Sequence, residues 1–458
     1  MSVHVCVDFG STYTKVTAID VENERWLGNA YALTTVQTNV LEGLNEALEK
    51  LNQTMVSPGE ITGFSACSSA AGGLKMAAIG LVEELTVEAA KRACLGAGAL
   101  VTHVFSHHLN RKDIEAIQHA SIDIILLAGG TDGGNSECIL HNAQKLAEAK
   151  LNIPIIVAGN KDAQETIEGY FSDQSDQLFI VDNVMPALRK LNVEEAKRVI
   201  RQIFITKIVE AKGIKRAEKL IGEIIMPTPE AVLIAAELLA RGTPTEAGIG
   251  ECMVIDIGGA TTDVHTIGEG YPKRAEVVMK GLQEPFAKRT VEGDLGMRYS
   301  AQAMVSLVSE RHFKERYQFN GDVHAAAHKR TQNVSYLADN DEERAFDQAL
   351  AKLCTDVSMS RHVGHVEVVH TPLGAMYYQL GKDLSDIQTV IGTGGVLIHH
   401  SNAKDILKEA TEKSDRKLEL RPSNPTVLVD QDYLFSAMGL LSQKYPDLAL
   451  KLMKRHLV

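Results

Sequence analysis

Residues 253–265 read MVIDIGGATTDVH, and residues 5–17 read VCVDFGSTYTKVT. In both stretches an apolar strand ends at an aspartate, and a short turn rich in glycine, serine or threonine leads into a second strand. Glycine lets the backbone approach an anion closely, and successive N–H groups in such a turn form a concavity that binds anions. Two turns of this kind predict a phosphate site built from both halves of the chain.

An aspartate beside a phosphate turn is also suited to hold magnesium. Asp8 and Asp256 end the two strands and lie about 248 residues apart. Mg²⁺ prefers oxygen ligands and keeps most of its water molecules, so one carboxylate from each turn is enough to hold the hydrated ion beside the phosphates. One such turn is more often an ordinary tight turn. Two of them, followed by a strand that ends at Gly392-Thr393-Gly394-Gly395, indicate a nucleotide site.

The same pattern predicts which residues contact the phosphates. Turn glycines supply backbone N–H groups at close range, and hydroxyl groups add hydrogen-bond donors. Lys15 is expected to neutralise phosphate charge, although a surface lysine at a strand edge is an equally good interpretation. The residues expected to cradle the phosphates are Gly10, Ser11, Thr12, Gly258, Gly259, Thr261 and Thr262.

Strand and helix patterns alternate along the chain, which predicts an α/β protein. An apolar run at 122–128 stops at a glycine pair and is typical of a buried strand. The stretch Gly129–Gly134 is either another anion-binding turn or, as we favour, a turn that joins a strand to a helix. Helices are expected at 40–51, 86–93, 137–149, 186–222, 230–240, 433–444 and through most of 272–380, and further strands at 25–33, 61–65, 153–158, 177–181 and 426–429.

We expect two domains and one insertion. The first domain covers 1–245 and contains an extra α/β unit near 135–225, and the second domain covers 246–458. Each domain opens with a strand, an Asp-x-Gly turn and another strand. A short last helix is expected after Pro446, placed to pack back on the first domain.

Composition excludes several classes of protein. The chain has 458 residues, of which 45% are hydrophobic and 23% charged, the usual balance of a globular protein. Its net charge of −12 argues against non-specific binding to nucleic acid or to an anionic membrane. The six cysteines are widely spaced and form no metal-binding framework. We read no signal peptide and expect a cytoplasmic protein.

The order of these motifs resembles that of the actin, hexokinase and seventy-kilodalton heat-shock ATPase superfamily. The resemblance covers most of the chain and implies an α/β actin-like ATPase fold, in which two ribonuclease-H-like domains flank a nucleotide cleft. It makes 390–398 the adenosine motif, where Gly394 and Gly395 would let adenine and ribose approach closely. It also implies two connecting helices, at 229–236 and 432–440.

Glu230 lies at the start of the first connecting helix. Chaperone-like members keep an acidic residue at this place near the attacking water, so the resemblance implies a catalytic role for Glu230 together with Asp8 and Asp256. A carboxylate in the first turn of a helix is also favoured by the helix dipole, which is the alternative interpretation.

Three stretches together resemble a narrower family: Asp8–Lys15, Leu127–Asn135 and Val291–Gly296. It comprises the glutamate mutase L proteins and the ornithine aminomutase accessory factor, which accompany adenosylcobalamin-dependent mutases. The resemblance implies an ATPase that uses ATP and Mg²⁺ and acts as a chaperone on mutase subunits, with glutamate (methylaspartate) mutase as the first expected client. It would release damaged cobalamin or keep the enzyme competent. Glu292 and Asp294 are expected either near the ribose or metal-bound water, or in a solvated loop.

Other functions remain open on the same fold. The client is alternatively ornithine aminomutase. A small-molecule kinase needs a base and a polar pocket for the acceptor hydroxyl, and no residues stand out for either task. A nucleotide-dependent scaffold or filament is the third alternative. The GxxxxGK[ST] pattern is absent, which excludes the common P-loop.

Overall fold

A computed structural model describes the chain except for residues 1, 11, 36–38, 56–59, 70–73, 212–220, 223 and 373. The chain forms two units. Unit 1 consists of Met1–Gly72 and Val209–Val458, and unit 2 consists of Gly73–Ile208. Within unit 1, one sheet is built from residues before 245 and a second sheet from residues after 245.

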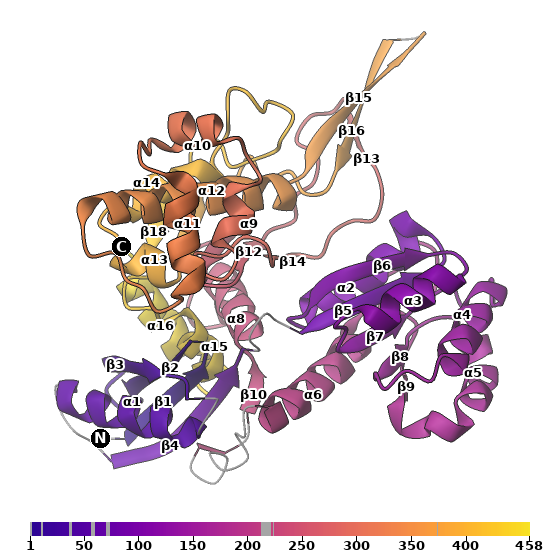
Figure 1. The fold of residues 1–458 in the computed structure, drawn as a ribbon, viewed down its shortest axis with the longest axis horizontal. Coiled ribbons are helices and arrows are strands. Elements are labelled where there is room, and N and C mark those ends of the chain that lie inside the picture. Colours follow the sequence, from indigo (N-terminus) through magenta and orange to yellow (C-terminus); the bar gives the residue numbers. More distant parts are fainter. Residues whose placement is uncertain are drawn as a thin grey trace. The chain divides into compact units, whose positions relative to one another are not determined.

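The two large sheets of unit 1 share one topology. Figure 1 shows the first of them as the strands β1, β2, β3, β4 and β10. In each sheet, three antiparallel strands are joined by two strands that run parallel to the first. The orders are β10-β4-β1-β2-β3 and β14-β12-β11-β17-β18. This repetition confirms the predicted fold with two ribonuclease-H-like halves. The strands are β1 (Ser2–Phe9), β2 (Tyr13–Asp20), β3 (Arg25–Leu33), β4 (Glu60–Ser68), β10 (Ile224–Pro227), β11 (Cys252–Ile257), β12 (Thr262–Ile267), β14 (Ala287–Glu292), β17 (Thr389–Thr393) and β18 (Thr426–Val429).

The central strand β11 is buried on both faces because its side chains alternate between two cores. Met253 and Ile255 belong to a core that includes residues of the long helix α12 (Asp341–His362). Cys252 and Val254 belong to another core, which includes residues of α8 (Thr228–Arg241) and α15 (Phe435–Leu441). A strand that is buried on both faces has apolar residues at nearly every position. This continuous apolar run is the reason why β11 is predictable from the sequence.

Helices α8 and α15 are counterparts, since each follows the last strand of its sheet. They correspond to the two expected connecting helices. A Cβ atom added to Gly439 of α15 would overlap the backbone of Ala231 in α8, so only glycine allows this approach. The close crossing that the small residues predict is therefore present.

The last helix, α16 (Pro446–His456), lies against the first half of unit 1. The Lys451 ammonium is 2.9 Å from the Glu24 carboxylate, and the Arg455 side chain donates to the Glu24 carbonyl over 3.0 Å. The rings of Trp26 and His456 also meet edge to face. The chain's C-terminus thus links the second half to the first.

The expectation that 272–380 is mostly helical is only partly correct. Four strands lie in this range, and three of them form a small sheet in the order β13-β16-β15. These strands are short or half-exposed, so their two-residue periodicity is weak against the helical pattern around them. The elements are β13 (Val277–Met279), α9 (Ala301–Val305), α10 (Glu310–Tyr317), α11 (Val323–Gln332), β15 (His365–Thr371), β16 (Gly374–Leu380), α13 (Gly395–His399) and α14 (Ala403–Leu407), while α1 (Val40–Thr54) belongs to the first half.

Unit 2 is an α/β unit with one parallel sheet in the order β6-β5-β7-β8-β9. It begins at Gly73, well before the expected start near 135, because β5 and β6 pair in the same sheet as β7. Gly129–Gly134 connects β7 to α4, as the turn interpretation predicts. The expected helices over 186–222 begin only with α6 at Glu194. The elements are β5 (Lys75–Gly80), α2 (Glu88–Gly96), β6 (Leu100–Ser106), α3 (Arg111–His119), β7 (Ile124–Leu127), α4 (Glu137–Glu148), β8 (Ile155–Val157), α5 (Gln164–Tyr170), β9 (Leu178–Ile180) and α6 (Glu194–Ala211).

None of the described helices has the length and apolar character that crossing a bilayer requires.

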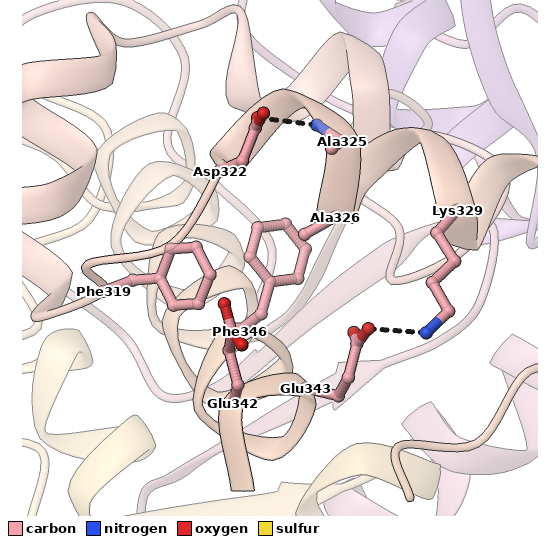
Figure 2. A pocket seen from close by; sticks show the side chains of 8 residues that line it. All are labelled: Phe319, Asp322, Ala325, Ala326, Lys329, Glu342, Glu343 and Phe346. Atoms are coloured by element: carbon pink, nitrogen blue, oxygen red, sulfur yellow. Dashed lines mark hydrogen bonds and ion pairs between the residues drawn. The ribbon is translucent and has the colours of Figure 1, made fainter. Parts of the chain in front are cut away.

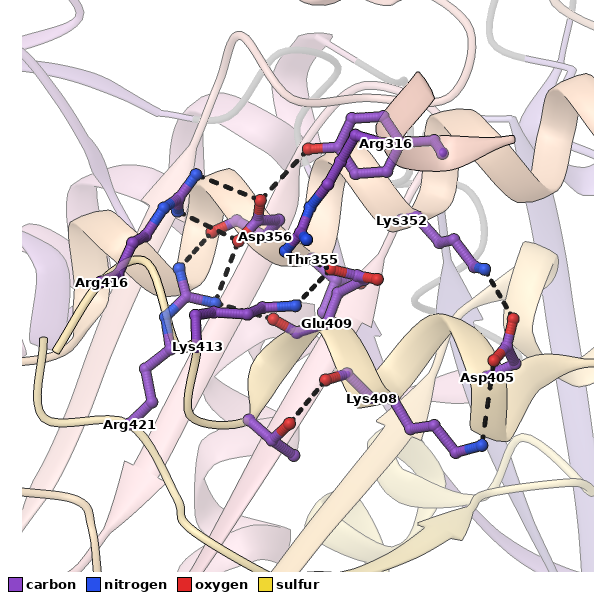
Figure 3. Close-up of polar contacts among 12 residues, drawn as sticks. Arg316, Lys352, Thr355, Asp356, Asp405, Lys408, Glu409, Lys413, Arg416 and Arg421 are labelled. Atoms are coloured by element: carbon purple, nitrogen blue, oxygen red, sulfur yellow. Dashed lines mark hydrogen bonds and ion pairs between the residues drawn. The ribbon is translucent and has the colours of Figure 1, made fainter. Parts of the chain in front are cut away.

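A buried ionic cluster ties the segment before β18 to α12 (Figure 3). Asp356 of α12 is fully buried and lies 3.1 Å from guanidinium nitrogens of both Arg416 and Arg421. The Tyr317 hydroxyl donates to the same carboxylate over 3.1 Å. Arg421 is fully buried as well, and it also pairs with Glu419 at 2.6 Å. Asp356 is therefore the fully buried carboxylate shared by two arginines, and Glu419 is a second carboxylate of the cluster.

Replacing Asp356 by Asn should destabilise unit 1 strongly. Asn keeps the shape but removes the carboxylate shared by both arginines and leaves Glu419 as the carboxylate beside Arg421, so the free energy of unfolding should fall by about 3 kcal/mol, the lower end of the range for breaking a buried ion pair. Denaturant unfolding measures this. The control is Asp341→Asn, which removes a fully exposed partner of Arg344 in the first turn of the same helix and should shift the unfolding midpoint far less than Asp356→Asn. Equal midpoints for the two variants would contradict the assigned role of the cluster.

Candidate nucleotide-binding site

The two predicted phosphate turns close in the same way. The Gly10 N–H donates to the Tyr13 carbonyl over 3.0 Å, and the Gly258 N–H donates to the Thr261 carbonyl over 2.9 Å. A Cβ atom on Gly10 would lie 2.5 Å from the Tyr13 carbonyl oxygen, so the turn requires glycine there. The equivalent hydrogen bonds show that the two turns are structural repeats.

Each turn carries its aspartate at the end of a strand. In the β1–β2 register Asp8 lies opposite Lys15, and in the β11–β12 register Asp256 lies opposite Asp263. The Asp8 carboxylate accepts a 2.6 Å hydrogen bond from the hydroxyl of Thr228, the first residue of α8. The first predicted metal ligand is therefore oriented from the connecting helix.

Electrostatic interactions join the two turns within unit 1. Burial, followed by the negative charge of Asp263, raises the pKa of Asp256 to about 7, and Lys15 opposes this change. Burial lowers the pKa of Lys15, whereas the charges of Asp8 and Asp256 raise it. The lysine of the first turn thus lies close enough to interact with the carboxylates of both turns, as a phosphate-neutralising residue must.

The negative charge of Asp263 is neutralised by Arg289 of the neighbouring strand β14. Its carboxylate lies 2.5 Å from a guanidinium nitrogen of Arg289 and accepts a 3.1 Å hydrogen bond from the Thr261 hydroxyl. This pairing fixes Asp263 on its own sheet, so Asp256 remains the carboxylate of the second turn that is available for a metal ion.

The glycine pair of the third motif lies beside Asp256. Gly394 has a φ of +100°, which favours glycine, and a Cβ there would lie 2.8 Å from the Asp256 carboxylate. A Cβ on Gly395 would meet no other described atom. The Thr393 hydroxyl donates to Asp430 over 2.9 Å. The predicted adenosine motif thus packs against the second predicted phosphate turn.

Not every predicted contact residue fits equally well. Ser11 lies outside the described residues. Thr12 and Gly259 are half-buried in their turns. Thr262 requires a correction, because its side chain is fully buried and its hydroxyl donates to the Leu295 carbonyl over 2.8 Å. It stabilises the turn from the core side and does not present its hydroxyl to a phosphate.

Glu230 is almost fully buried in the first turn of α8, behind Pro229. It lies two residues after Thr228, which holds Asp8, and next to Ala231, which contacts Gly439. Along α8, Glu230 thus lies between the residue that holds Asp8 and the residue at the helix crossing, and its catalytic role stays a prediction.

Residues 296–300 pack against the second turn and support it. A Cβ on Gly296 would overlap the backbone of Ala260, so the segment packs directly on the turn. Four hydrogen bonds add to this contact: Met297 N–H to Gly258 O at 3.1 Å, Arg298 N–H to Gly259 O at 2.8 Å, Tyr299 N–H to Gly259 O at 3.0 Å, and the Ser300 hydroxyl to Ala260 O at 3.1 Å.

Glu292 and Asp294 are both paired with one arginine, Glu292 largely buried and Asp294 partly exposed. Both carboxylates lie 2.6 Å from the same guanidinium nitrogen of Arg361 in α12, and Asp294 accepts a second bond of 2.8 Å. These ion pairs anchor the supporting segment. The signal for this role is the sequence Glu-Gly-Asp-Leu-Gly, in which Gly296 makes the close contact.

Asp430 is a site residue that sequence reasoning missed. It follows β18, is buried, and accepts hydrogen bonds from the backbone N–H groups of Leu434 and Phe435 at 2.8 and 3.2 Å. Thr228, the first residue of α8, is bonded to Asp8, and Asp430 binds backbone N–H groups at the start of α15 and the Thr393 hydroxyl, so the start of each connecting helix is tied to a predicted nucleotide motif.

The residues present fit a hydrated magnesium ion. Among the described residues, no group of three or more His, Cys, Asp or Glu side chains is arranged to hold a metal. Asp8 and Asp256 supply two carboxylates, so Mg²⁺ there would take its remaining ligands from water and phosphate, as this ion usually does.

A small pocket of about 210 Å³ lies elsewhere in unit 1, between α11 and α12 (Figure 2). It contains none of the predicted nucleotide residues, and its Lys329 is already paired with Glu343 at 2.6 Å. Its lining residues are Phe319, Asp322, Ala325, Ala326, Lys329, Glu342, Glu343 and Phe346.

Comparisons with known proteins identify similar chains. Residues 4–457 match the family model described as MutL protein. A relative from Clostridium tetanomorphum, named Protein MutL, is 50% identical over 462 residues, and the match covers 100% of both chains. Among solved structures, a nucleotide-free acetone carboxylase is 15% identical with a TM-score of 0.41, covering 96% of this chain and 70% of that one. A glycerol dehydratase reactivase is 12% identical with a TM-score of 0.35, covering 96% and 99%. Because both TM-scores are below 0.5, these similarities indicate nothing about the function of this chain.

Replacing Gly296 by Ala should weaken binding of ATP with Mg²⁺. The added methyl group displaces Ala260 and with it the second turn, so hydrogen bonds from the turn to the phosphates are weakened, each worth about 1.5–3 kcal/mol when the acceptor is charged. Calorimetric titration should show a dissociation constant about 10- to 100-fold higher. Gly169→Ala is the control, because a Cβ there meets nothing within 4 Å. A folded Gly296→Ala protein with unchanged affinity would refute the supporting role.

Proposed function

The chain belongs to the MutL protein family, and from this premise we propose that it is an ATP-dependent factor that reactivates or maintains an adenosylcobalamin-dependent mutase, with glutamate mutase as the client. The observation that carries the proposal is the pair of equivalent turns whose aspartates both interact with Lys15. Such a pair is suited to grip a nucleotide from two halves of a protein that can move relative to one another.

In this proposal Asp8 and Asp256 hold a hydrated Mg²⁺, which neutralises phosphate charge when bound. The N–H groups of Gly10 and Gly258 close the two turns, so the phosphates would be met by the turn residues that follow them, such as Gly259. Lys15 contributes a positive charge between the two carboxylates. Gly394 packs tightly on Asp256, whereas Gly395 has open space around its Cβ position, so Gly395 would be the residue beside which the adenosine moiety is accommodated.

Glu230 is proposed to orient the attacking water for hydrolysis. A buried carboxylate near the phosphate turns is able to accept a hydrogen bond from water and fix its direction. Because Glu230 lies beside the crossing of α8 and α15, loss of the terminal phosphate at this site would alter the contacts that hold the two helices.

The link to the client is thermodynamic. A nucleotide can loosen a damaged mutase only if the ATP-bound and ADP-bound forms of this protein bind the mutase with different affinities. The connecting helices are the elements suited to create that difference, since Thr228 and Asp430 tie their starts to the nucleotide motifs. Subunits of a cobalamin-dependent mutase are therefore the proposed partners.

Reactivation tests the proposal directly. Glutamate mutase inhibited by cyanocobalamin should regain activity when it receives this protein, ATP, Mg²⁺ and fresh adenosylcobalamin. Omission of ATP, or replacement of this protein by Asp8→Asn, should leave the mutase inactive. Recovery with ornithine aminomutase alone would change the client, and no recovery with either enzyme would refute the proposed function.

Glu230→Gln separates catalysis from stability. Gln keeps the shape and loses the charge, so single-turnover hydrolysis should fall by about 10²–10⁴-fold while ATP affinity stays close to that of the wild type. Glu237→Gln is the matched control, because Glu237 lies on the same helix and pairs only with Arg241 among the ion pairs described. Hydrolysis at the wild-type rate in Glu230→Gln would remove Glu230 from the catalytic residues.

A further inference from the structure

The ammonium group of Lys15 lies over an aromatic ring from the other half of unit 1. The Lys15 nitrogen is 3.4 Å from the centre of the Tyr433 ring. Lys15 belongs to β2, whereas Tyr433 lies between β18 and α15. An ammonium over the face of a ring is attracted by the ring's electrons, and the attraction is stronger when the pair is shielded from water.

Tyr433 adopts a backbone conformation that a bulky residue normally avoids. Its φ is +54°, in the left-handed region, where such side chains are genuine outliers. A conformation of this kind persists only when the surroundings impose it.

The neighbours of Tyr433 impose this conformation. The Tyr433 N–H donates to the Asp430 carbonyl over 3.0 Å. The preceding residue, Asp432, accepts a 2.6 Å hydrogen bond at its carbonyl from the Asn29 side chain, and its carboxylate lies 2.7 Å from the His456 ring. The segment is thus fixed from both halves of unit 1, and the ring is aimed at Lys15.

The ring shares its surroundings with the acidic groups of the site. Asp8 lies opposite Lys15 in the sheet, and Asp256 and Asp430 also interact electrostatically with the lysine. Without the ring, the flexible side chain of Lys15 would be free to collapse onto Asp8 as an ordinary cross-strand ion pair. The face of a ring holds the ammonium without accepting all of its N–H donors, so donors remain for phosphate oxygens.

We propose that Tyr433 is a positioning residue whose ring holds the Lys15 ammonium between the two phosphate turns, ready for a nucleotide phosphate. This inference rests on the proposed function, namely that a nucleotide binds between the turns. In this arrangement a phosphate that binds Lys15 would also change the contact between Lys15 and Tyr433, just before the start of α15. Tyr433 itself does not contact the reacting atoms.

The test compares three substitutions by calorimetric titration of ATP with Mg²⁺. Tyr433→Leu and Tyr433→Asn should raise the dissociation constant about tenfold, within the range expected for loss of a partly buried ammonium–ring contact. Asn tolerates the left-handed backbone, so it covers the case in which the leucine variant does not fold. Tyr433→Phe keeps the ring and should stay within about twofold of the wild type.

A double-mutant cycle shows whether the effect passes through Lys15. In a Lys15→Gln background, Tyr433→Leu should change the affinity by less than about twofold, because its partner is already gone. The matched control is Tyr336→Leu, which removes a ring 4.1 Å from the Lys329 ammonium outside the site and should not change the affinity.

The outcomes separate the two proposals. Wild-type affinity in the folded Leu and Asn variants, or the same tenfold loss in the Lys15→Gln background, overturns the positioning role alone. A wild-type protein that binds no ATP overturns the proposed function, and the positioning role with it.

Discussion

The approach of Gly439 to the backbone of Ala231 is the constraint on which the rest of unit 1 depends. It determines how closely α8 and α15 cross, and each of these helices begins directly after the last strand of its sheet. Thr228 and Asp430, at the starts of the two helices, bind Asp8 and Thr393. The helix crossing is therefore connected by direct hydrogen bonds to the predicted nucleotide motifs of both halves.

Local sequence patterns predicted the parts of the fold that are locally determined. β1, β2, β11 and β12 are apolar strands around glycine turns, and β18 was located over the same residues, 426–429. The small sheet of β13, β15 and β16 was missed because half-exposed strands show little periodicity. The true start of unit 2 at Gly73 was missed because the pairing of β5 with β7 is a long-range contact.

Some residues of the candidate site are likewise predictable from local sequence patterns, and others are not. Asp8, Gly10, Asp256, Gly258 and Gly394 carry a visible signal, because a turn that binds an anion needs glycine and a metal needs a carboxylate. Thr262 fits that residue pattern equally well, yet it faces the core, since alternate residues of a strand point to opposite sides. Asp430 and Tyr433 have no comparable signal, as their roles depend on partners more than 30 residues away in sequence.

Nucleotide binding by paired variants is the most direct test of the central claim that one nucleotide is held by both turns. Calorimetry with ATP and Mg²⁺ should show one site per wild-type chain, and ATP at about 100 times its dissociation constant should stabilise the protein by roughly 2.7 kcal/mol. Asp8→Asn and Asp256→Asn, made separately, should each abolish the dependence of binding on Mg²⁺. If either variant retained full magnesium-dependent binding, the two turns would not share one site and the account would be contradicted.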